Sequence, residues 1–328
     1  MATCEAMCPA AEISFRSRNF LINRLEATSD SCNGPRSKYV VDPFKMVKEY
    51  SRSAADTHKY NKPELLRPFA VLDRTIDHLL QLYTPFQDRR ESVTTPEFSS
   101  VFSFVSDRLR AVRQDMIMQS MDGKHASFLI EKMLPFYIET DGMCKMGKCS
   151  SYDRKLHEFQ LEECFGRWYE EVSSSSIVAD PRIAACFFFR QVHRKPTILH
   201  ELYIFRSKLP PARFDVIRDV ICSFLSNNYC RFFANFAQLD PLEQYSLSDS
   251  ISHIRQSAMR TISVAFKTPV AKLPSQLFSK WLGFPADRDF IENFFQLYKV
   301  IPDENRCVLI SSIKPVEIPD LEFSSRQF

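Results

Sequence analysis

The feature that most constrains the fold of this chain is one apolar stripe between Phe98 and Met116. Its members recur at intervals of three or four positions: Phe98, Val101, Phe102, Val105, Leu109, Val112 and Met116. Because an α-helix completes a turn about every 3.6 residues, this spacing places all of them on one face over about five turns. We therefore predict a long amphipathic helix whose apolar face is buried against other elements.

Two further helices are predicted upstream of this stripe. Asp42 is a good N-cap and Pro43 suits the first helical position. The apolar residues that follow have helical spacing: Phe44, Val47, Tyr50 and Ala54. The second helix begins near Arg67-Pro68 and carries apolar residues up to Tyr83. Both are expected to pack beside the long helix.

Helical periodicity continues through most of the remaining chain. The predicted helices cover 124–140, 154–171, 181–193, 196–206, 210–226, 228–238 and 241–265. Several of the short connections between them contain proline, such as Pro196 and Pro241. Consecutive helices with short connections pack as antiparallel pairs. The expected fold class is therefore all-α dominated, an α-helical repeat or solenoid.

The pattern changes after Phe266 and predicts a small module of a different kind. A strand at Val270–Leu273 is followed by helices at Pro274–Leu282 and Ala286–Lys299. Short strands are then expected at 300–301, 306–310 and 313–318. This order is that of a winged helix. The predicted domains are an extended arm and linker over 1–37, a helical domain over 38–265 and a winged-helix domain over 266–328.

Composition and motifs argue against an enzyme. The chain has only 6 glycines, and none forms a phosphate-binding loop. The sequence contains no nucleophile elbow or zinc-protease motif, and its 10 cysteines and 7 histidines lack metal-site spacing. We expect no catalytic residues, no cofactor and no metal. The 43 basic and 40 acidic residues are interspersed, which is typical of solvated helix faces.

The sequence also predicts an intracellular protein that does not insert into membranes. The longest apolar run, Ile183–Phe189, is far shorter than the roughly 20 residues that span a bilayer. The N-terminus lacks a basic region followed by an apolar core, so we expect no secretory signal. The cysteines are therefore expected to be reduced thiols.

Two charged or unusual clusters have alternative interpretations. The segment from Asp107 to Asp115 could dock a partner, or its side chains could bridge helices of the same domain. Within it, Asp107 and Arg110 are spaced to pair across one helical turn. The segment from Cys4 to Arg16 could pin an extended arm to the domain, or it could be a disordered terminus.

These clusters together resemble the motif blocks of the SAC/GANP family. The opening block is similar to Gly-x-Cys-x-x-Met-Cys-Pro-x-x-Glu-x-x-x-Arg, with Ala2 in place of the first glycine. The residues that carry the resemblance, and that we take as the candidate structural or partner-binding site, are Cys4, Met7, Cys8, Pro9, Glu12, Arg16, Lys48, Glu49, Tyr50, Arg52, Asp56, Arg67, Pro68, Asp107, Arg108, Arg110, Arg113, Gln114 and Asp115. Ser106 and Pro135 stand where the family usually has Trp and Arg.

The resemblance implies a PCI-like fold, in which helical repeats end in a winged helix, and a scaffold role. Larger members assemble the nuclear-pore-associated TREX-two complex of mRNA export. They bind a PCI-type subunit and a small acidic peptide subunit, and the paired winged helices contact RNA or DNA. The expected location is the nucleus and cytoplasm, at the nuclear pore or the centrosome and spindle.

Two alternative functions remain. The chain has neither a nucleoporin-like arm nor a long C-terminal extension, so it resembles the short members linked to centrosome duplication and spindle organisation. The other alternative is direct nucleic-acid binding by the winged helix. Residues 266–328 carry eight basic and eight acidic residues, whereas nucleic-acid-binding modules normally have a basic excess. This balance favours protein binding, with any RNA contact shared with a partner.

Overall fold

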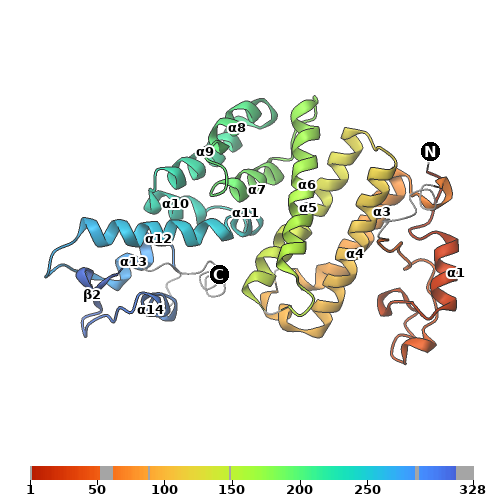
Figure 1. The fold of residues 1–328 in the computed structure, drawn as a ribbon, viewed down its shortest axis with the longest axis horizontal. Coiled ribbons are helices and arrows are strands. Elements are labelled where there is room, and N and C mark those ends of the chain that lie inside the picture. The colour runs from red at the N-terminus through yellow and green to blue at the C-terminus, as the bar shows by residue number, and fades with distance from the viewer. Residues whose placement is uncertain (1, 52–61, 88, 148, 285–287, 315–328) are drawn as a thin grey trace. The chain divides into compact units, whose positions relative to one another are not determined.

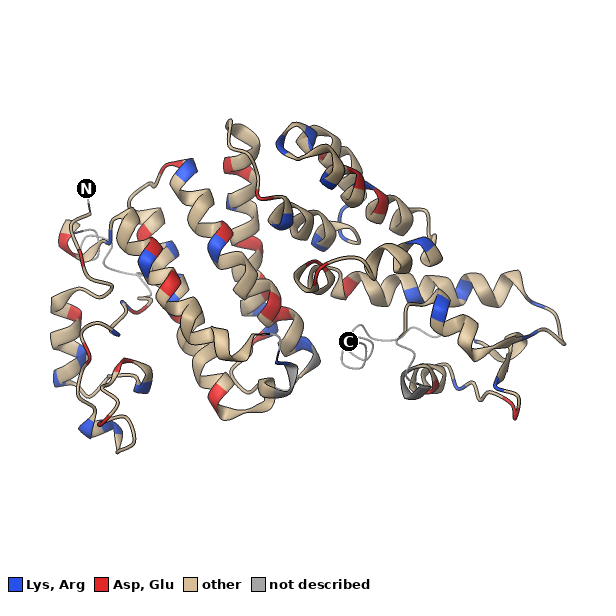
Figure 2. Cartoon of the chain, turned by 180° about the vertical axis from the view of Figure 1, so that it is seen from behind, with Lys and Arg blue, Asp and Glu red and all other residues tan. Residues whose placement is uncertain are grey.

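The structure is a computed structural model that describes residues 2–51, 62–87, 89–147, 149–284 and 288–314. The described chain is mostly α-helical with very little sheet, so the predicted all-α helical repeat class is confirmed. It forms two compact units. Unit 1 comprises Met1–Thr140 and Gly147–Ser175, and unit 2 comprises Asp141–Met146 and Ser176–Phe328. Basic and acidic residues are interspersed along the helices of both units (Figure 2).

Unit 1 consists of an N-terminal segment packed on a layer of long helices (Figure 1). Its helices are α1 (Ala10–Arg18), α3 (Phe69–Tyr83), α4 (Pro96–Met118), the greater part of α5 (Gly123–Met146) and α6 (Arg154–Ser174). The layer is held by contacts such as the edge-to-face pair of Tyr83 and Phe136, whose ring centroids are 5.0 Å apart. Trp168 Nε1 donates to Glu131 Oε1 at 2.8 Å and joins α6 to α5.

Helix α4 confirms the predicted apolar stripe. All of its predicted apolar positions, from Phe98 to Met116, are buried. Thr95 caps its N-terminus, since Thr95 Oγ1 accepts a hydrogen bond from the Phe98 amide at 3.1 Å. The helix is therefore the central element against which the rest of the unit packs.

The prediction of a helix that begins at Asp42 is wrong for the residues that the structure describes. One turn forms at 42–46, and the chain then runs without helix to Ser51, while Ala54 lies outside the described residues. Met46, Val47 and Lys48 are buried one after another, which a helix with a single inward face does not allow. Non-local hydrogen bonds, described below, replace the helical ones.

The first part of unit 2 is a series of helices, and proline is the first residue of three of them. The helices are α7 (Pro181–Gln191), α8 (Ile198–Ile204), α9 (Pro211–Leu225), α10 (Tyr229–Phe236), α11 (Pro241–Ser246) and α12 (Ser248–Ala265). Asp180 Oδ1 caps α7 through the Arg182 amide at 2.7 Å. The single helix predicted over 241–265 is divided at Leu247, which is fully buried.

The C-terminal part of unit 2 follows the predicted order of strand, helix, helix and strand. These elements are β1 (Lys272–Pro274), α13 (Ser275–Trp281), α14 (Arg288–Leu297) and β2 (Cys307–Leu309). The strands pair antiparallel with Leu273 opposite Val308. Residues 300–301 form no strand, residues 310–312 form a 3₁₀ turn, and most of the strand predicted at 313–318 lies outside the described residues. The winged-helix assignment therefore stays a prediction.

The limits of the two compact units differ from the domain limits predicted from sequence. The units are defined by packing, so the predicted domains stay a prediction. The predicted arm over 1–37 packs within unit 1. The predicted boundary after 265 crosses one hydrophobic core, in which Met259 and Ile262 of α12 pack with Phe278, Phe295 and Val308. A shared core holds both sides of that boundary in one unit.

In the part of the chain that the structure describes, each helix is too short or too polar to span a lipid bilayer. The ten cysteines all lie in the described residues, and none of them forms a disulfide bond.

Candidate functional site

Residues 47–50 of the N-terminal segment, which we define as residues 2–50, donate backbone hydrogen bonds to carboxylates of that segment and of α4. The Val47 amide donates to Glu26 Oε1 at 3.2 Å, and the Glu49 amide donates to Glu12 Oε1 at 2.8 Å. The Tyr50 amide donates to Asp107 Oδ2, on α4, at 3.2 Å. Side-chain carboxylates thus satisfy amides that a helix or a sheet would otherwise satisfy.

An ionic group centred on the buried Glu26, the Glu26 cluster, joins α1 to the later part of this segment and to α4. It comprises Glu12, Arg16, Glu26, Glu49 and Arg108. Arg16 forms a direct ion pair with Glu26, and the two residues are 1% and 0% exposed. Arg108 Nη2 lies 3.4 Å from Glu26 Oε1 and 3.0 Å from Glu49 Oε1. Burial raises the pKa of the Glu12 carboxyl above its usual range, although Arg16 opposes that rise.

A second buried ionic group, the Asp115 cluster, joins three blocks of the sequence. Lys48 Nζ lies 2.6 Å from Asp115 Oδ1, and Arg67 Nε donates to Asp115 Oδ2 at 2.7 Å. Arg67 also donates to the Met7 carbonyl at 3.2 Å, and the Lys48 amide donates to the same carbonyl at 3.0 Å. Because Asp115 is completely buried, its two cations are the groups that compensate its charge.

The remaining polar residues of α4 have different partners. Gln114 Nε2 donates to the Ser51 carbonyl at 2.8 Å, and Arg113 Nη1 donates to Gln160 Oε1 at 2.6 Å. The pairing predicted between Asp107 and Arg110 is absent from the described residues. Asp107 instead pairs with Arg108, and the Arg110 guanidinium lies 3.9 Å from the centroid of the Tyr50 ring.

This difference predicts unequal effects of two arginine substitutions. Arg113→Ala removes hydrogen bonds to Gln160 and Glu163 and should lower the free energy of unfolding by about 1–3 kcal/mol. Arg110→Ala removes a cation–π contact and should cost about 0.5–1 kcal/mol. Chemical denaturation of both variants measures the difference. An equal loss would mean that hydrogen bonding does not decide the contribution of these side chains.

The two cysteines of the opening block, Cys4 and Cys8, are both buried. The Cys4 amide donates to the Leu66 carbonyl at 3.0 Å, just before Arg67-Pro68 and the start of α3. Cys8 is 1% exposed, and burial raises the pKa of its thiol. Pro9 immediately precedes α1. The remaining candidates, Arg52 and Asp56, lie outside the described residues.

The most connected member of this network was not among the candidates predicted from sequence. Glu26 bonds Arg16, Arg108 and the amides of Asn23 and Val47. Its sequence signal is weak, because Asn23-x-x-Glu26 is a capping box of a very short helix. A capping box explains only the bond to Asn23. The bonds of Glu26 to Arg16, Arg108 and Val47 become apparent only in the folded chain.

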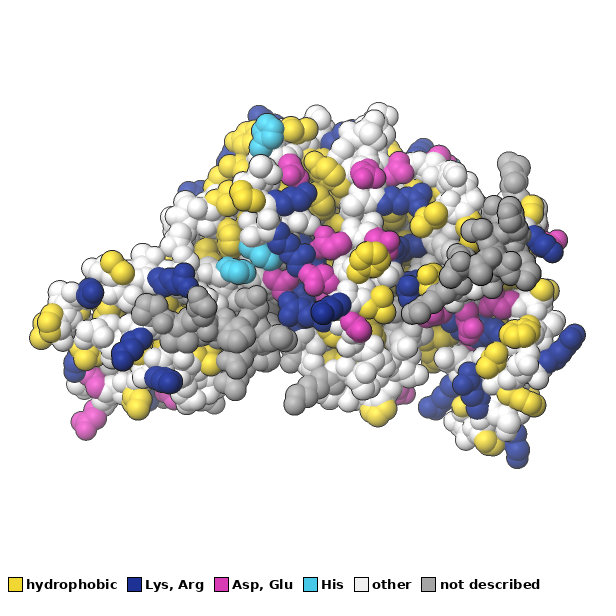
Figure 3. Space-filling view, viewed as in Figure 1, with side chains coloured by type: hydrophobic (Ala, Val, Ile, Leu, Met, Phe, Trp, Pro, Cys, Tyr) yellow, Lys and Arg dark blue, Asp and Glu magenta, His cyan; other side chains and the backbone are white. Residues whose placement is uncertain are grey.

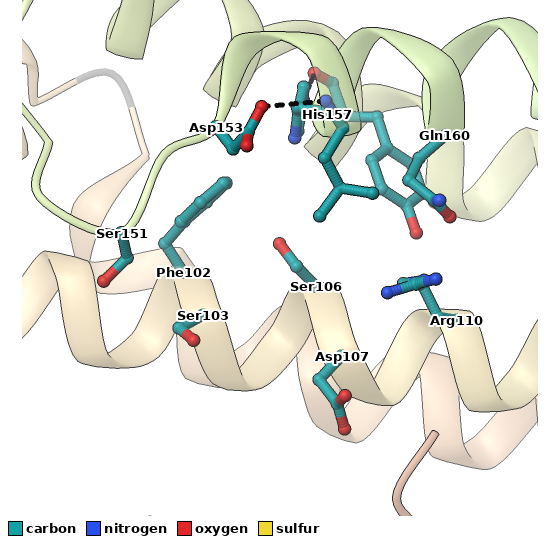
Figure 4. A pocket seen from close by; sticks show the side chains of 11 residues that line it. Phe102, Ser103, Ser106, Asp107, Arg110, Ser151, Asp153, His157 and Gln160 are labelled. Carbon is teal, nitrogen blue, oxygen red and sulfur yellow. Dashed lines mark hydrogen bonds between the residues drawn. The ribbon is translucent and has the colours of Figure 1, made fainter. Parts of the chain in front are cut away.

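A cavity of about 200 Å³ lies between α4 and α6 (Figure 4). Ser106 and Arg110 reach it from α4, and His157 and Gln160 from α6. Three of its titratable groups already bond within the protein. Asp107 accepts the Tyr50 amide, Asp153 caps α6, and His157 Nε2 lies 2.8 Å from the Tyr137 carbonyl. This arrangement favours a structural role for these groups over general acid–base chemistry.

Unit 2 contains a buried ionic cluster of its own. Asp141 Oδ2 lies 2.8 Å from Lys145 Nζ and 2.9 Å from Arg190 Nη1. Lys145 also lies 3.1 Å from Asp249, which Arg194 approaches to 3.4 Å. The cluster joins the last turn of α5 to α7 and α12. Within the described residues, we find no group of His, Cys, Asp and Glu side chains that could hold a metal ion.

One histidine beside this cluster gives unit 2 a predicted pH dependence. His193 Nδ1 lies 3.0 Å from Ser250 Oγ, and its ring stacks on that of His253. Burial lowers the pKa of His193 to about 4, against the opposing effect of Asp249. A lowered pKa means that the folded state disfavours the protonated ring. The resulting stability is present above pH 6.5 and is lost as the pH falls toward 4.

We therefore expect acidification from pH 7 to pH 4 to destabilise unit 2 by about 1–3 kcal/mol through this ring alone. His193→Asn, which keeps a polar group near Ser250, should remove that part of the dependence. Thermal unfolding of the two proteins over this pH range tests the expectation. Parallel curves for both would show that His193 is not the responsible group.

Comparison with known proteins agrees with the motif blocks. The chain is similar to the protein xmas of Drosophila melanogaster, with 23% identity over 329 residues that cover 96% of this chain and 15% of xmas. It is also similar to SAC3 family protein B of Arabidopsis thaliana, with 29% identity over 139 residues that cover 42% of this chain and 7% of the plant protein. The chain thus spans a small part of the length of either relative. A model of the SAC3/GANP family matches residues 7–303, nearly the whole chain, and the chain therefore belongs to the SAC3/GANP family.

Proposed function

We propose that this chain is a non-enzymatic scaffold that assembles protein subunits for mRNA export, in a complex of the TREX-two type. Membership of the SAC3/GANP family supports a scaffold-type role. The observation that carries the proposal is the use of the motif side chains. Asp115, Arg67 and Arg16 are fully buried and bonded to one another, to Glu26 or to backbone groups, so they rigidify a surface rather than face a substrate.

The proposed partners are a PCI-type subunit and a small acidic peptide subunit, with any RNA contact shared with them. A rigid helical unit suits this role because binding then orders few side chains and loses less entropy. The proposed location is the nucleus and cytoplasm, at the nuclear pore. A role at the centrosome and spindle is the alternative outcome of the test below.

Affinity purification of the full chain, followed by mass spectrometry, tests the proposal. We expect a PCI-type subunit and a small acidic subunit to co-purify in similar amounts. Recovery of centrosomal or spindle proteins in their place would contradict the export role. A salt titration of RNA binding by the purified chain is the second arm. Tight binding without a partner, with a steep dependence on salt, would favour direct nucleic-acid binding instead.

A further inference from the structure

The N-terminal segment is firmly held to α4, yet it exposes a set of apolar side chains. The set is Phe15, Phe20, Leu21, Val40 and Phe44, with exposed fractions of 59%, 60%, 38%, 59% and 87%. Single exposed apolar residues are normal, but a group of them on one segment indicates an interaction surface. In Figure 3, this part of the molecule (lower right) carries hydrophobic and basic side chains next to one another.

Hydrogen bonds to backbone carbonyls bring the parts of this surface together. Arg36 Nε donates to the Ile22 carbonyl at 3.2 Å, so the loop before Val40 lies against the turn after α1. The Thr28 amide donates to the Val40 carbonyl at 2.9 Å. Phe15, Phe20, Leu21 and Val40 therefore belong to one folded part of the segment, whose own core contains Ile22 and Met46.

The backbone at Phe20 suggests that this ring is exposed for a reason other than folding. Phe20 follows the C-cap of α1 with φ of 56°, and the Leu21 amide donates to the Arg16 carbonyl at 2.9 Å. This geometry is a Schellman motif, whose left-handed position is usually occupied by glycine. A side chain at such a position strains the backbone. Because the Phe20 ring is mostly exposed, burial of that ring offsets little of the strain.

Exposed charges on the same segment have mainly one sign. Between residues 2 and 50 the exposed charged residues are Arg18, Arg24, Arg36, Lys38, Glu5 and Asp30. Lys45 and Asp42 pair with each other at 3.2 Å, and Arg16 and Glu26 are buried. The segment thus exposes four cations and two carboxylates along with its apolar side chains. A partner of complementary charge is acidic.

We propose that this surface binds an acidic protein segment that also carries apolar side chains. Aromatic anchors surrounded by arginine and other polar groups are typical of protein interfaces. A single-stranded nucleic acid would match the cations and the phenylalanine rings, but Leu21 and Val40 have no flat face on which a base could stack. The proposal rests on the scaffold role above and adds the surface and the chemistry of one partner.

Fluorescence anisotropy with a labelled synthetic peptide tests the proposal on the full chain. The peptide alternates Glu with Leu and Trp, and a labelled oligo(U) RNA is the second probe. We expect the peptide to bind. Phe20→Gly should weaken its binding at least about tenfold, as expected for an interface anchor. The same substitution should leave the melting temperature unchanged or raise it, because glycine relieves the strain at this position.

Matched controls separate binding from stability. Phe15 and Phe159 are both 59% exposed and lie on helices of unit 1, so Phe15→Ala should weaken peptide binding while Phe159→Ala leaves it unchanged. Arg24→Glu combined with Lys38→Glu should weaken binding and reduce its salt dependence. Lys155→Glu combined with Lys267→Glu makes the same change in net charge elsewhere and should have no effect.

Three results would overturn this proposal. They are no binding of the peptide, equal binding by the Phe20→Gly variant, and binding of the RNA in preference to the peptide. Co-purification of subunits with the Phe20→Gly variant distinguishes an error in the surface assignment from an error in the proposed scaffold role. If peptide binding is absent while a PCI-type subunit still co-purifies, the surface assignment is wrong and the scaffold role stands.

Discussion

Asp115→Ala should be among the most destabilising single substitutions in this chain. It leaves Lys48 and Arg67, which are 5% and 0% exposed, without the carboxylate that compensates them. Removing one partner of a buried ionic group typically costs about 3–5 kcal/mol, because the remaining charge stays buried and unpaired. For a domain of this size we expect the melting temperature of unit 1 to fall by about 10 °C. Thermal unfolding monitored by circular dichroism measures this fall in melting temperature.

Asp73→Ala is the matched control for that substitution. Asp73 also pairs with a lysine, Lys132, but its side chain is 30% exposed and Asp77 remains to bind the same lysine. Exposed ion pairs contribute about 0–1 kcal/mol, so this variant should melt within a few degrees of the wild type. Equal losses for Asp73→Ala and Asp115→Ala would contradict the claim that burial makes the Asp115 cluster important.

Deletion of residues 1–18 should have a still larger effect. It removes the buried Cys8, the Met7 carbonyl that accepts from Arg67, and Arg16, the direct ion partner of Glu26. The loss of one buried ionic partner and of buried apolar surface together should cost more than about 5 kcal/mol. We expect a melting temperature more than about 10 °C below that of the wild type, or a protein that does not fold.

Two point variants on α1 show whether the deletion acts through this contact. Arg16→Ala should reproduce a large part of the loss, since Arg16 is buried against Glu26. Arg18→Ala, two residues away and exposed, should change the melting temperature little. If the deletion leaves the melting temperature unchanged, the segment serves a partner or has no role in stability.

The helical layer could be predicted from sequence because its signal is local and repeated. The stripe from Phe98 to Met116 has one period over about five turns, and a single buried face satisfies all of it. The helix start near Arg67-Pro68 was similarly readable, since proline acts on the adjacent backbone.

The path of residues 46–50 could not be predicted in this way. The Asp42-Pro43 start and the apolar spacing after it favour a helix, and only one turn forms. Three carboxylates distant in sequence, on Glu12, Glu26 and Asp107, accept amide hydrogens there and replace the helical bonds. Propensity rules read only neighbouring residues, so tertiary hydrogen bonds of this kind override them.

Only part of the candidate site could be predicted from sequence, because its contacts also join residues that are distant in the chain. The motif blocks identified Arg16, Arg67, Lys48 and Asp115 as special, but spacing alone could not show that these residues meet one another. The spacing of Asp107 and Arg110 predicted a pair within α4. In the structure, Tyr50 of the N-terminal segment contacts both residues instead. Asp107 accepts a hydrogen bond from the Tyr50 amide, and Arg110 stacks on the Tyr50 ring.

Hydrogen exchange of the Val47, Glu49 and Tyr50 amides tests most directly whether the N-terminal segment is an integral part of unit 1. The Tyr50 amide donates to Asp107 of α4, and the Val47 amide donates to Glu26, which is itself paired with Arg108 of α4. The Glu49 amide donates to Glu12 within the segment, and none of the three amides can exchange until its contact opens. We predict protection of Val47 and Tyr50 close to that of the core amides of α4. Exchange of these amides as fast as in an unstructured peptide, with α4 still protected, would contradict the account.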